Sequence, residues 1–112
     1  MQLETAGALR NRASIFAALG DETRLSVLAR LCEGSPQSIS RLTAGTDLTR
    51  QAVTKHLRVL TEAGMVRNMR VGRESLFQLQ PEPLEEARDY LAEISRRWDD
   101  ALGRLKAFVE GS

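Results

Sequence analysis

The sequence is poor in the residues that hold small domains together without a large core. Its one cysteine, Cys32, excludes both an intrachain disulfide and a multi-cysteine metal cage. Its one histidine, His56, leaves a zinc coordination shell incomplete. No apolar run approaches the roughly 20 residues that cross a bilayer, and the start, Met1-Gln2-Leu3-Glu4, has no basic segment leading into an apolar one. We therefore expect a soluble, cytoplasmic protein with no metal site and no membrane partner.

Length and composition limit the chain to one small domain. Its 112 residues, 42% of them hydrophobic, provide one modest core and fall below the length at which cores split into domains. We expect a single domain over residues 1–112, with helices and a hairpin over 8–80 and a last helix over 82–110. One histidine and scattered glycines supply neither a Ser/His/Asp set nor a phosphate loop, so we expect no enzyme and no cofactor.

Charge is nearly balanced overall but unevenly distributed. The net charge is +1, yet residues 1–80 carry +4 and residues 81–112 carry −3. The stretch 50–73 holds six cations against Glu62 alone. Most of the chain's cations are arginine, whose planar guanidinium suits phosphate oxygens and guanine edges. A basic patch is usually only a solvated surface, so the elements that carry these charges must decide whether it contacts nucleic acid.

Apolar spacing and chain breakers predict five helices and one hairpin. Asp21 and Thr49 are good N-cap residues, while Gly20 and Gly64 are favoured helix ends. The expected helices cover 8–19, the segment from Asp21 to the breakers at 34–36, 38–44, 49–63 and 84–109, and the expected strands cover 65–69 and 74–79 around a turn at 70–73. The short third helix and the longer fourth helix, joined by a brief turn, form a helix-turn-helix pattern.

The same spacing predicts which residues face inward. Pro81 and Pro83 are expected to break the chain before the last helix begins. The expected inward-facing residues are Leu9, Ala13, Phe16 and Leu19 in the first helix, Leu25, Leu28, Leu31 and Cys32 in the second, Ile39 and Leu42 in the third, and Val53, Leu57 and Leu60 in the fourth. A place on an apolar stripe favours a buried packing role for Cys32 over oxidation between subunits.

The fourth helix carries the main functional signal. With about 100° per residue, Leu57 and Leu60 fall within about 40° of Val53 and mark the buried side. The opposite side carries amide, hydroxyl and cationic groups, which suit base edges in a major groove. An ordinary amphipathic surface helix has the same periodicity, but the short helix before it and the hairpin after it favour a recognition helix. The opposite side holds Gln51, Thr54, Lys55 and Arg58, and the other candidate DNA-binding residues of this segment are Thr49, Arg50 and His56.

Two further DNA-binding candidates lie on the hairpin, and one candidate of the fourth helix has an alternative role. Arg70 and Arg73 are expected at the hairpin tip, where they would reach phosphates or the minor groove beside the recognition helix. Gly72 would let the tip turn and the backbone come close. His56 lies about 60° from the apolar stripe, so it is expected either to pack at the edge of the core or to face a phosphate.

The last helix carries a second signal, a heptad repeat. Leu84, Leu91, Trp98 and Leu105 recur every seven residues, and Ala87, Ile94, Ala101 and Phe108 follow three residues after each. Packing against the first helix of the same chain would use part of this seam. Its length favours a homodimer, because a helix with Trp98 and Phe108 exposed is an aggregation hazard.

The motifs resemble those of the ArsR-type winged-helix repressors over nearly the whole chain. The matching runs are Phe16-Ala17-Ala18-Leu19-Gly20-Asp21-Glu22-Thr23-Arg24-Leu25, the segment 48–60 with its Lys55-His56-Leu57 core, Glu62-Ala63-Gly64-Met65-Val66 and Arg70-Val71-Gly72-Arg73. The resemblance implies a mostly α winged helix-turn-helix fold with a β-hairpin wing. It also implies a homodimer joined through its first and last helices, with Leu9 and Phe16 in the interface, that represses transcription at an operator on double-stranded DNA.

The resemblance also bears on metals. Many family members sense metals through cysteines at the start of the third helix or through His, Asp and Glu on the last. Here residues 35–40 read Ser-Pro-Gln-Ser-Ile-Ser and the last helix has no histidine, so the chain looks like the metal-independent branch, some of whose members repress their own operon. The operator and the effector stay undetermined. The alternative function is a winged-helix protein-interaction module whose arginine patch meets an acidic protein.

Overall fold

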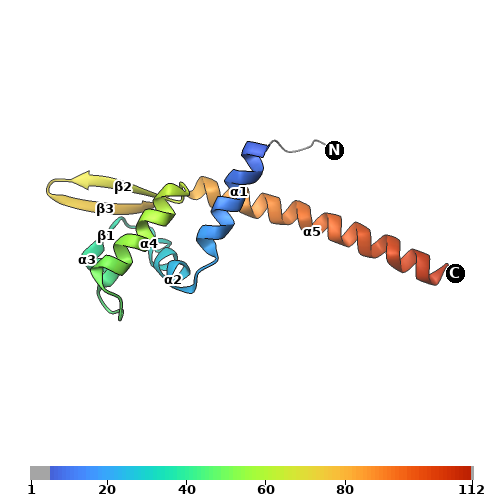
Figure 1. Ribbon diagram of the computed structural model, residues 1–112, viewed down its shortest axis with the longest axis horizontal. Helices are drawn as coiled ribbons and strands as arrows, with labels where there is room; N and C mark the ends of the chain where they lie inside the picture. The colour runs from blue at the N-terminus through green and yellow to red at the C-terminus, as the bar shows by residue number, and fades with distance from the viewer. Residues whose placement is uncertain (1–5, 112) are drawn as a thin grey trace.

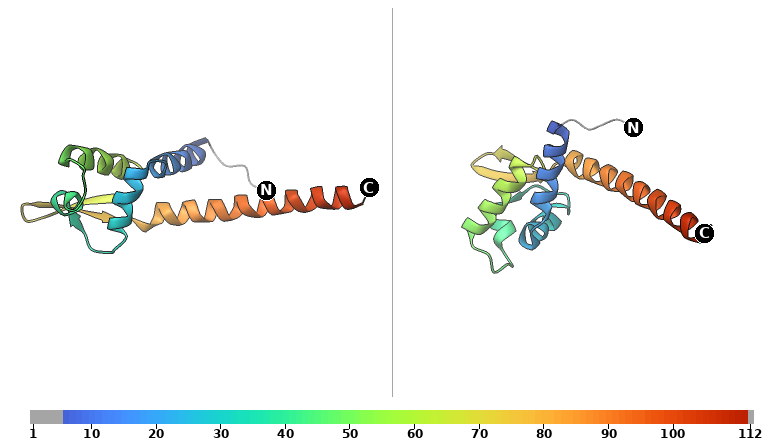
Figure 2. Two further views of the ribbon diagram at one scale, coloured as in Figure 1. Left: turned by 90° about the horizontal axis from the view of Figure 1, so that it is seen from below. Right: turned by 45° about the vertical axis from the view of Figure 1, so that its right-hand side comes forward.

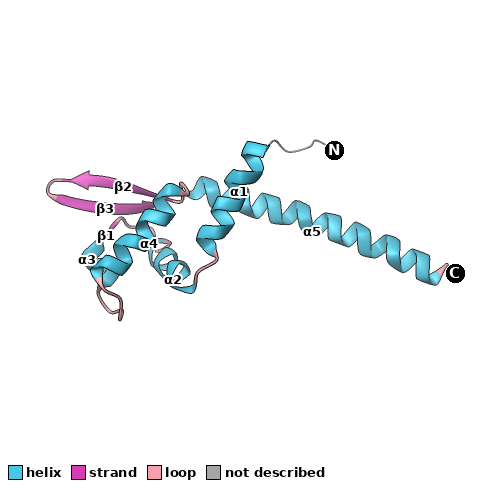
Figure 3. Ribbon diagram, viewed as in Figure 1, coloured by secondary structure: helices cyan, strands magenta, loops and turns pink. Residues whose placement is uncertain are grey.

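The computed structural model describes residues 6–111, which form helices around a small sheet (Figures 1 and 3). Two helices and the first short strand precede the helix-turn-helix, and a hairpin and a long helix follow it. The elements are α1 (Ala6–Leu19), α2 (Glu22–Leu31), β1 (Gln37–Ser38), α3 (Ile39–Thr43), α4 (Arg50–Glu62), β2 (Val66–Val71), β3 (Glu74–Leu79) and α5 (Pro81–Glu110). The predicted order of helices and hairpin is therefore confirmed.

Side-chain caps fix the starts of the three central helices. The carboxylate of Asp21 accepts from the backbone N–H of Arg24, and the hydroxyl of Thr49 accepts from that of Ala52. Ser38 caps α3 in the same way. Capping satisfies backbone donors that a helix start otherwise leaves unpaired. The predicted caps at Asp21 and Thr49 are confirmed, and Gly64 adopts a positive φ of 76° where α4 ends.

The sheet has three antiparallel strands in the order β1-β3-β2. The hairpin turns at Gly72, whose φ of 64° suits a residue without a side chain. The predicted turn at 70–73 was too wide, because Arg70 pairs with Ser75 inside the ladder and only Arg73 is at the tip. The sequence did not predict β1, which pairs Gln37 with Phe77 on the open edge of β3.

The core lies where α1, α2, α3 and α4 meet the sheet. It contains the predicted residues Leu28, Leu31, Leu42, Val53, Leu57 and Leu60, together with Ile15, Ala18, Val27, Met65, Val66, Phe77 and Ala87. Some predicted inward positions were wrong. Leu9 and Ala13 are exposed because α1 turns Ile15 and Ala18 to the core, and Leu25 is 48% exposed because α2 buries Val27 instead. Cys32 is exposed as well, since it caps the end of α2 beyond the packed stripe.

The last helix extends far beyond the packed domain (Figure 2). It begins at Pro81 rather than at Leu84, because proline fits the first turn of a helix, where its missing N–H has no partner to lose. At 1.5 Å per residue its 30 residues span about 45 Å. Only its first part packs on α1 and the core, and it gives the protein a longest dimension of 69 Å. Within residues 6–111 no helix is long and apolar enough to cross a membrane.

Candidate nucleic-acid interface

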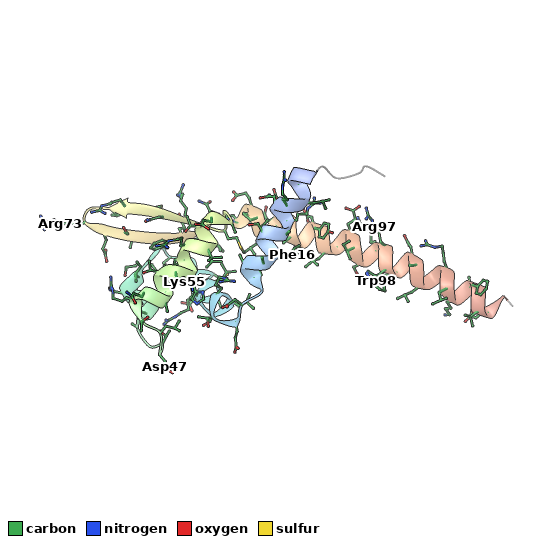
Figure 4. All side chains as sticks on the ribbon, in the orientation of Figure 1. Phe16, Asp47, Lys55, Arg73, Arg97 and Trp98 are labelled. Atoms are coloured by element: carbon green, nitrogen blue, oxygen red, sulfur yellow. The ribbon has the colours of Figure 1, made fainter. Side chains whose placement is uncertain are left out.

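The outer side of α4 presents polar and cationic groups around a shallow hollow. Val53, Leu57 and Leu60 are buried on the inner side, as the helical wheel predicts. The hollow of about 390 Å³ is lined by Arg50, Gln51, Thr54, Lys55 and Arg58. All of these except the partly covered Thr54 are exposed, and Lys55 is labelled on α4 in Figure 4. The structure thus brings five of the predicted DNA-binding residues together on one surface.

Arginine side chains hold the turn between α3 and α4. Nη1 of Arg30 on α2 donates to the carbonyl oxygens of Leu42 and Ala44, at 2.8 and 2.9 Å. Nη1 of Arg50 donates to the hydroxyl oxygen of Ser40 at 2.6 Å and so links the start of α4 to α3. Charge-assisted hydrogen bonds of this kind are stronger than neutral ones. Arg30 is a positioning residue that sequence periodicity could not reveal.

The two threonines of the predicted set are partly committed to the helix itself. The hydroxyl of Thr49 accepts the N–H of Ala52 as the helix cap. The hydroxyl of Thr54 donates to the carbonyl oxygen of Arg50 at 2.7 Å. Each hydroxyl has one donor and two acceptor positions, so both can still take part in a further hydrogen bond. Gln51, Lys55 and Arg58 make no side-chain hydrogen bond or ion pair within residues 6–111, and their donors are open to solvent.

The wing carries the other predicted cations away from the body of the domain. Arg73 extends from the hairpin tip, as Figure 4 shows, and Arg70 is exposed on β2. The structure does not bring these two side chains into the hollow on α4. Arg67 belongs to the same basic stretch but lies on the opposite face of the hairpin from Arg70. Its guanidinium is close to Met69 and Gln78 on that face.

His56 differs from its neighbours on α4. Its side chain is half-buried, and its Nδ1 is buried without a hydrogen-bond partner within residues 6–111. The pKa of Asp21 is lowered from 3.8, chiefly because the backbone N–H of Arg24 donates to its carboxylate. The positive charge of Arg24 lowers that pKa further, and so does the electrostatic contribution of the nearby His56. His56 therefore lies near the cap of α2, at the edge of the core.

No described cluster offers a metal ligand set, because residues 6–111 hold no group of three or more His, Cys, Asp and Glu arranged for one. The predicted burial of Cys32 was wrong, since its side chain is exposed at the end of α2.

The heptad seam of α5 divides into two parts. Its start is covered within the chain: Ala87 is buried, Leu84 packs on the core, and the ring of Tyr90 lies 6.0 Å from that of Phe16. Farther along, Leu91 is 53% exposed, Trp98 64% and Leu105 58%. Figure 4 shows Trp98 and Arg97 on different sides of the helix. Ile94 is half-buried, whereas Phe108 is exposed. Leu102 and Val109 are exposed as well, at positions outside the predicted seam.

Comparison with known proteins identifies the family. The pattern of a helix-turn-helix domain matches residues 19–68. The uncharacterized HTH-type transcriptional regulator YuzN of Bacillus subtilis (strain 168) is 38% identical over 81 residues, which cover 67% of this chain and 88% of YuzN. The match with YuzN therefore extends beyond the helix-turn-helix itself.

Solved structures extend the similarity to the whole fold. The ArsR-like transcriptional regulator from Rhodococcus sp. RHA1 has a TM-score of 0.81 and 36% identity, over 92% of this chain and 96% of that chain. The homodimeric winged helix-turn-helix DNA-binding domain Mb0332 from Mycobacterium bovis shares the fold at 20% identity, with a TM-score of 0.64 over 91% of this chain and 94% of that one. The chain belongs to the ArsR family of winged helix-turn-helix transcriptional regulators, which bind DNA.

Proposed function

We propose that the protein is a homodimeric repressor that occupies an operator through α4 and the wing, and that its own operon is one target. The observation that carries this proposal is the exposed hollow on α4, where Gln51, Lys55 and Arg58 have open donors. An α-helix fits the major groove, and the N-terminal residues of a recognition helix meet the base edges. Gln51 lies in the first turn of α4, where base reading takes place.

The proposed contacts fall into two kinds. Gln51 bonds an adenine edge and Lys55 or Arg58 a guanine edge, which gives sequence preference. Thr49 and Arg50 lie at the helix start, where they bind phosphate, and Thr54, whose hydrogen is already donated to the carbonyl oxygen of Arg50, supports the base-reading residues. His56 contacts a phosphate only through its exposed side, because its Nδ1 is buried.

The wing contributes affinity rather than sequence preference. Arg73 at the tip and Arg70 on β2 are exposed arginines on an element that extends beyond α4. Arginine binds phosphates and enters narrow minor grooves. A contact to a phosphate contributes the same affinity on any DNA sequence. Removing Arg73 is therefore expected to weaken binding to all DNA alike.

The proposed dimer is built on α5 together with α1. The exposed seam from Leu91 to Phe108 lies outside the core of its own domain. Leu102 and Val109 broaden it beyond the two positions per heptad of a simple coiled coil, which suits packing against more than one partner helix. Leu9, exposed on α1, is also placed in this interface. The Mycobacterium bovis domain with the same fold is itself homodimeric.

The acidic charge of the last helix supports a dimer in which the α4 helices and the wings face the DNA. Residues 81–112 carry a net charge of −3, while residues 1–80 carry +4. A two-fold dimer that buries the α5 seam leaves the basic wings and α4 helices to face two half-sites of DNA. Repulsion between the acidic helix and phosphates then keeps the other end of the dimer off the duplex.

Binding to the DNA upstream of the protein's own gene tests the proposal. The expected result is a footprint with two protected half-sites, and a shuffled duplex of the same length and composition is the control. Half-sites are expected about 34–36 Å apart, or a multiple of that spacing, because each recognition helix enters one major groove. No protection above that of the shuffled duplex would contradict an operator at this position.

A further inference from the structure

A second hollow, called the cleft below, lies between α4 and the wing, on the inner side of the proposed DNA-binding surface. Its volume is about 250 Å³. Leu57 of α4 and Phe77 of β3 form its floor, and both belong to the buried core. Asn68 of β2 lines the wing side. An apolar floor with a few polar groups at its edge is the kind of lining that small-molecule pockets have, here at a volume below the roughly 300 Å³ at which such pockets usually begin.

Apart from Arg58, the α4 wall offers few donors to a ligand. The hydroxyls of Thr54 and Thr61 both line the cleft and both donate to carbonyl oxygens of their own helix, those of Arg50 and Leu57, at 2.7 Å. A hydroxyl has one hydrogen to donate, so neither threonine has one left for an occupant. Together with the apolar floor, this favours a flat apolar ring over a sugar or a phosphate group.

Charged side chains at the cleft determine which way round an anionic ligand binds. Arg58 lines the cleft, is exposed and makes no hydrogen bond or ion pair within residues 6–111. Strand register pairs Asn68 with Phe77 and Arg70 with Ser75, so Arg70 shares the wing face of the cleft residues. Glu62 lies one helical turn after Arg58 and repels an anion at its own end. An anionic group is therefore attracted to the end with Arg58.

We propose that this cleft binds a small aromatic molecule with one anionic group, and that its occupant competes with DNA. Thr54 and Arg58 line both the cleft and the hollow on the outer side of α4. A ligand that engages Arg58 removes that guanidinium from the DNA surface and adds a negative charge beside it. The competition rests on the proposed DNA-binding function, whereas binding of the small molecule does not.

Nuclear magnetic resonance with 2-naphthoate as the probe tests the site in the full-length protein. The expected result is saturable shifts of the backbone amides of Thr61, Asn68 and Phe77. The exposed concavity on α5 around Ile94 and Trp98 is the other apolar site that the probe could enter. Shifts confined to that concavity, or no saturable shifts at all, would overturn the proposal.

Two pairs of measurements isolate the cleft. Asn68→Phe should fill it and abolish the shifts, while Met69→Phe, at the next position of β2 and on its opposite face, should leave them intact.

Arg58→Gln should weaken the binding of 2-naphthoate about tenfold or more, because a charge-assisted hydrogen bond is lost. The same variant should leave the weaker binding of neutral 2-naphthalenemethanol unchanged. Equal effects of the paired variants, or equal losses for both probes, would contradict the assigned site.

Competition is measured with a labelled duplex of random sequence, for which no operator needs to be known. We expect 2-naphthoate to raise the apparent Kd for the duplex in the wild type and in Met69→Phe, and not in Asn68→Phe. Shifts at the cleft without competition would overturn the proposed regulation while leaving the binding site in place. A wild type that binds 2-naphthoate but no DNA would instead contradict the proposed function.

Discussion

Nη1 of Arg30 on α2 donates a 2.8 Å hydrogen bond to the carbonyl oxygen of Leu42, the buried residue of α3. The same nitrogen reaches the carbonyl oxygen of Ala44 at 2.9 Å, where the turn toward α4 begins. A helix end leaves carbonyl groups without partners, and this guanidinium satisfies two of them. One side chain therefore ties the packing of α2 to the direction in which α4 leaves the turn.

We predict that Arg30→Ala lowers both stability and DNA affinity. Loss of hydrogen bonds to a charged donor costs about 1.5–3 kcal/mol in the free energy of unfolding. Urea denaturation measures this change, and a DNA titration measures the accompanying loss of affinity. Arg41→Ala is the matched control, because Arg41 is exposed on α3 and its side chain makes no hydrogen bond within residues 6–111. Equal effects of the two variants would show that Arg30 acts only through its charge.

Sequence preference is predicted to depend on Gln51. Gln51→Ala should cost about 1–3 kcal/mol on the protected site and little on random DNA, because only a base-reading contact distinguishes the two. Arg73→Ala should weaken both kinds of DNA about equally, since a phosphate contact carries no sequence information. Parallel titrations with the two duplexes measure both variants. An equal loss on both duplexes for Gln51→Ala would remove its base-reading role.

The cap at Asp21 predicts a dependence of stability on acid. The pKa of Asp21 is lowered from 3.8 in the folded chain, chiefly by the backbone N–H of Arg24. The folded state is therefore favoured by the ionised carboxylate above pH 3.8, and this contribution is lost as the pH falls through the lowered pKa. Asp21→Asn keeps a good cap but does not titrate. Its free energy of unfolding should fall less steeply with acid than that of the wild type, and parallel curves would exclude a contribution from Asp21.

DNA binding is predicted to be independent of metals. Residues 35–40 have no cysteine, and α5 has no histidine. Operator titrations with a chelator, with zinc and with arsenite should give the same affinity. Reproducible release of DNA by a stoichiometric amount of any of these reagents would overturn the prediction. Cys32→Ser is the control for arsenite, because Cys32 is exposed and could react without forming a binding site.

Local signals explain why much of the fold and the exposed polar surface of α4 could be predicted. The caps at Asp21 and Thr49 are hydrogen bonds between near neighbours, so residue type and spacing suffice to find them. The buried and exposed sides of α4 follow from one strong helical periodicity. These features place Gln51 and Lys55 on one surface without knowledge of the rest of the fold.

Tertiary contacts explain the rest. In α1 either of two apolar stripes satisfies the helical period, and only the position of α2 and α5 selects Ile15 and Ala18 over Leu9 and Ala13. β1 is two residues long and exists because β3 offers it an open edge. Arg30 and Arg50 hold the turn through contacts with residues distant in sequence. The cleft at Asn68 likewise depends on how α4 lies against the hairpin.

The last prediction is that the dimer is obligate and is built mainly on α5. Trp98 lies in the middle of the exposed seam and is 64% exposed in the single chain. Removing a large aromatic from a packed core costs about 3–5 kcal/mol, and two-fold symmetry applies the loss once per subunit. Trp98→Ala should therefore dissociate the dimer and abolish operator binding with every DNA-facing residue intact, because one winged helix makes too few phosphate contacts at physiological salt.

Analytical ultracentrifugation beside an operator titration measures both effects of Trp98→Ala. Arg96→Ala is the control, because Arg96 is two residues away and about 200° around the helix from Trp98. That variant should remain dimeric and bind DNA as the wild type does, since it removes a charge from the opposite side of α5. A wild type that is monomeric at micromolar concentration would place the interface elsewhere. A dimeric Trp98→Ala protein with normal DNA binding would likewise show that the interface is not built on this part of α5.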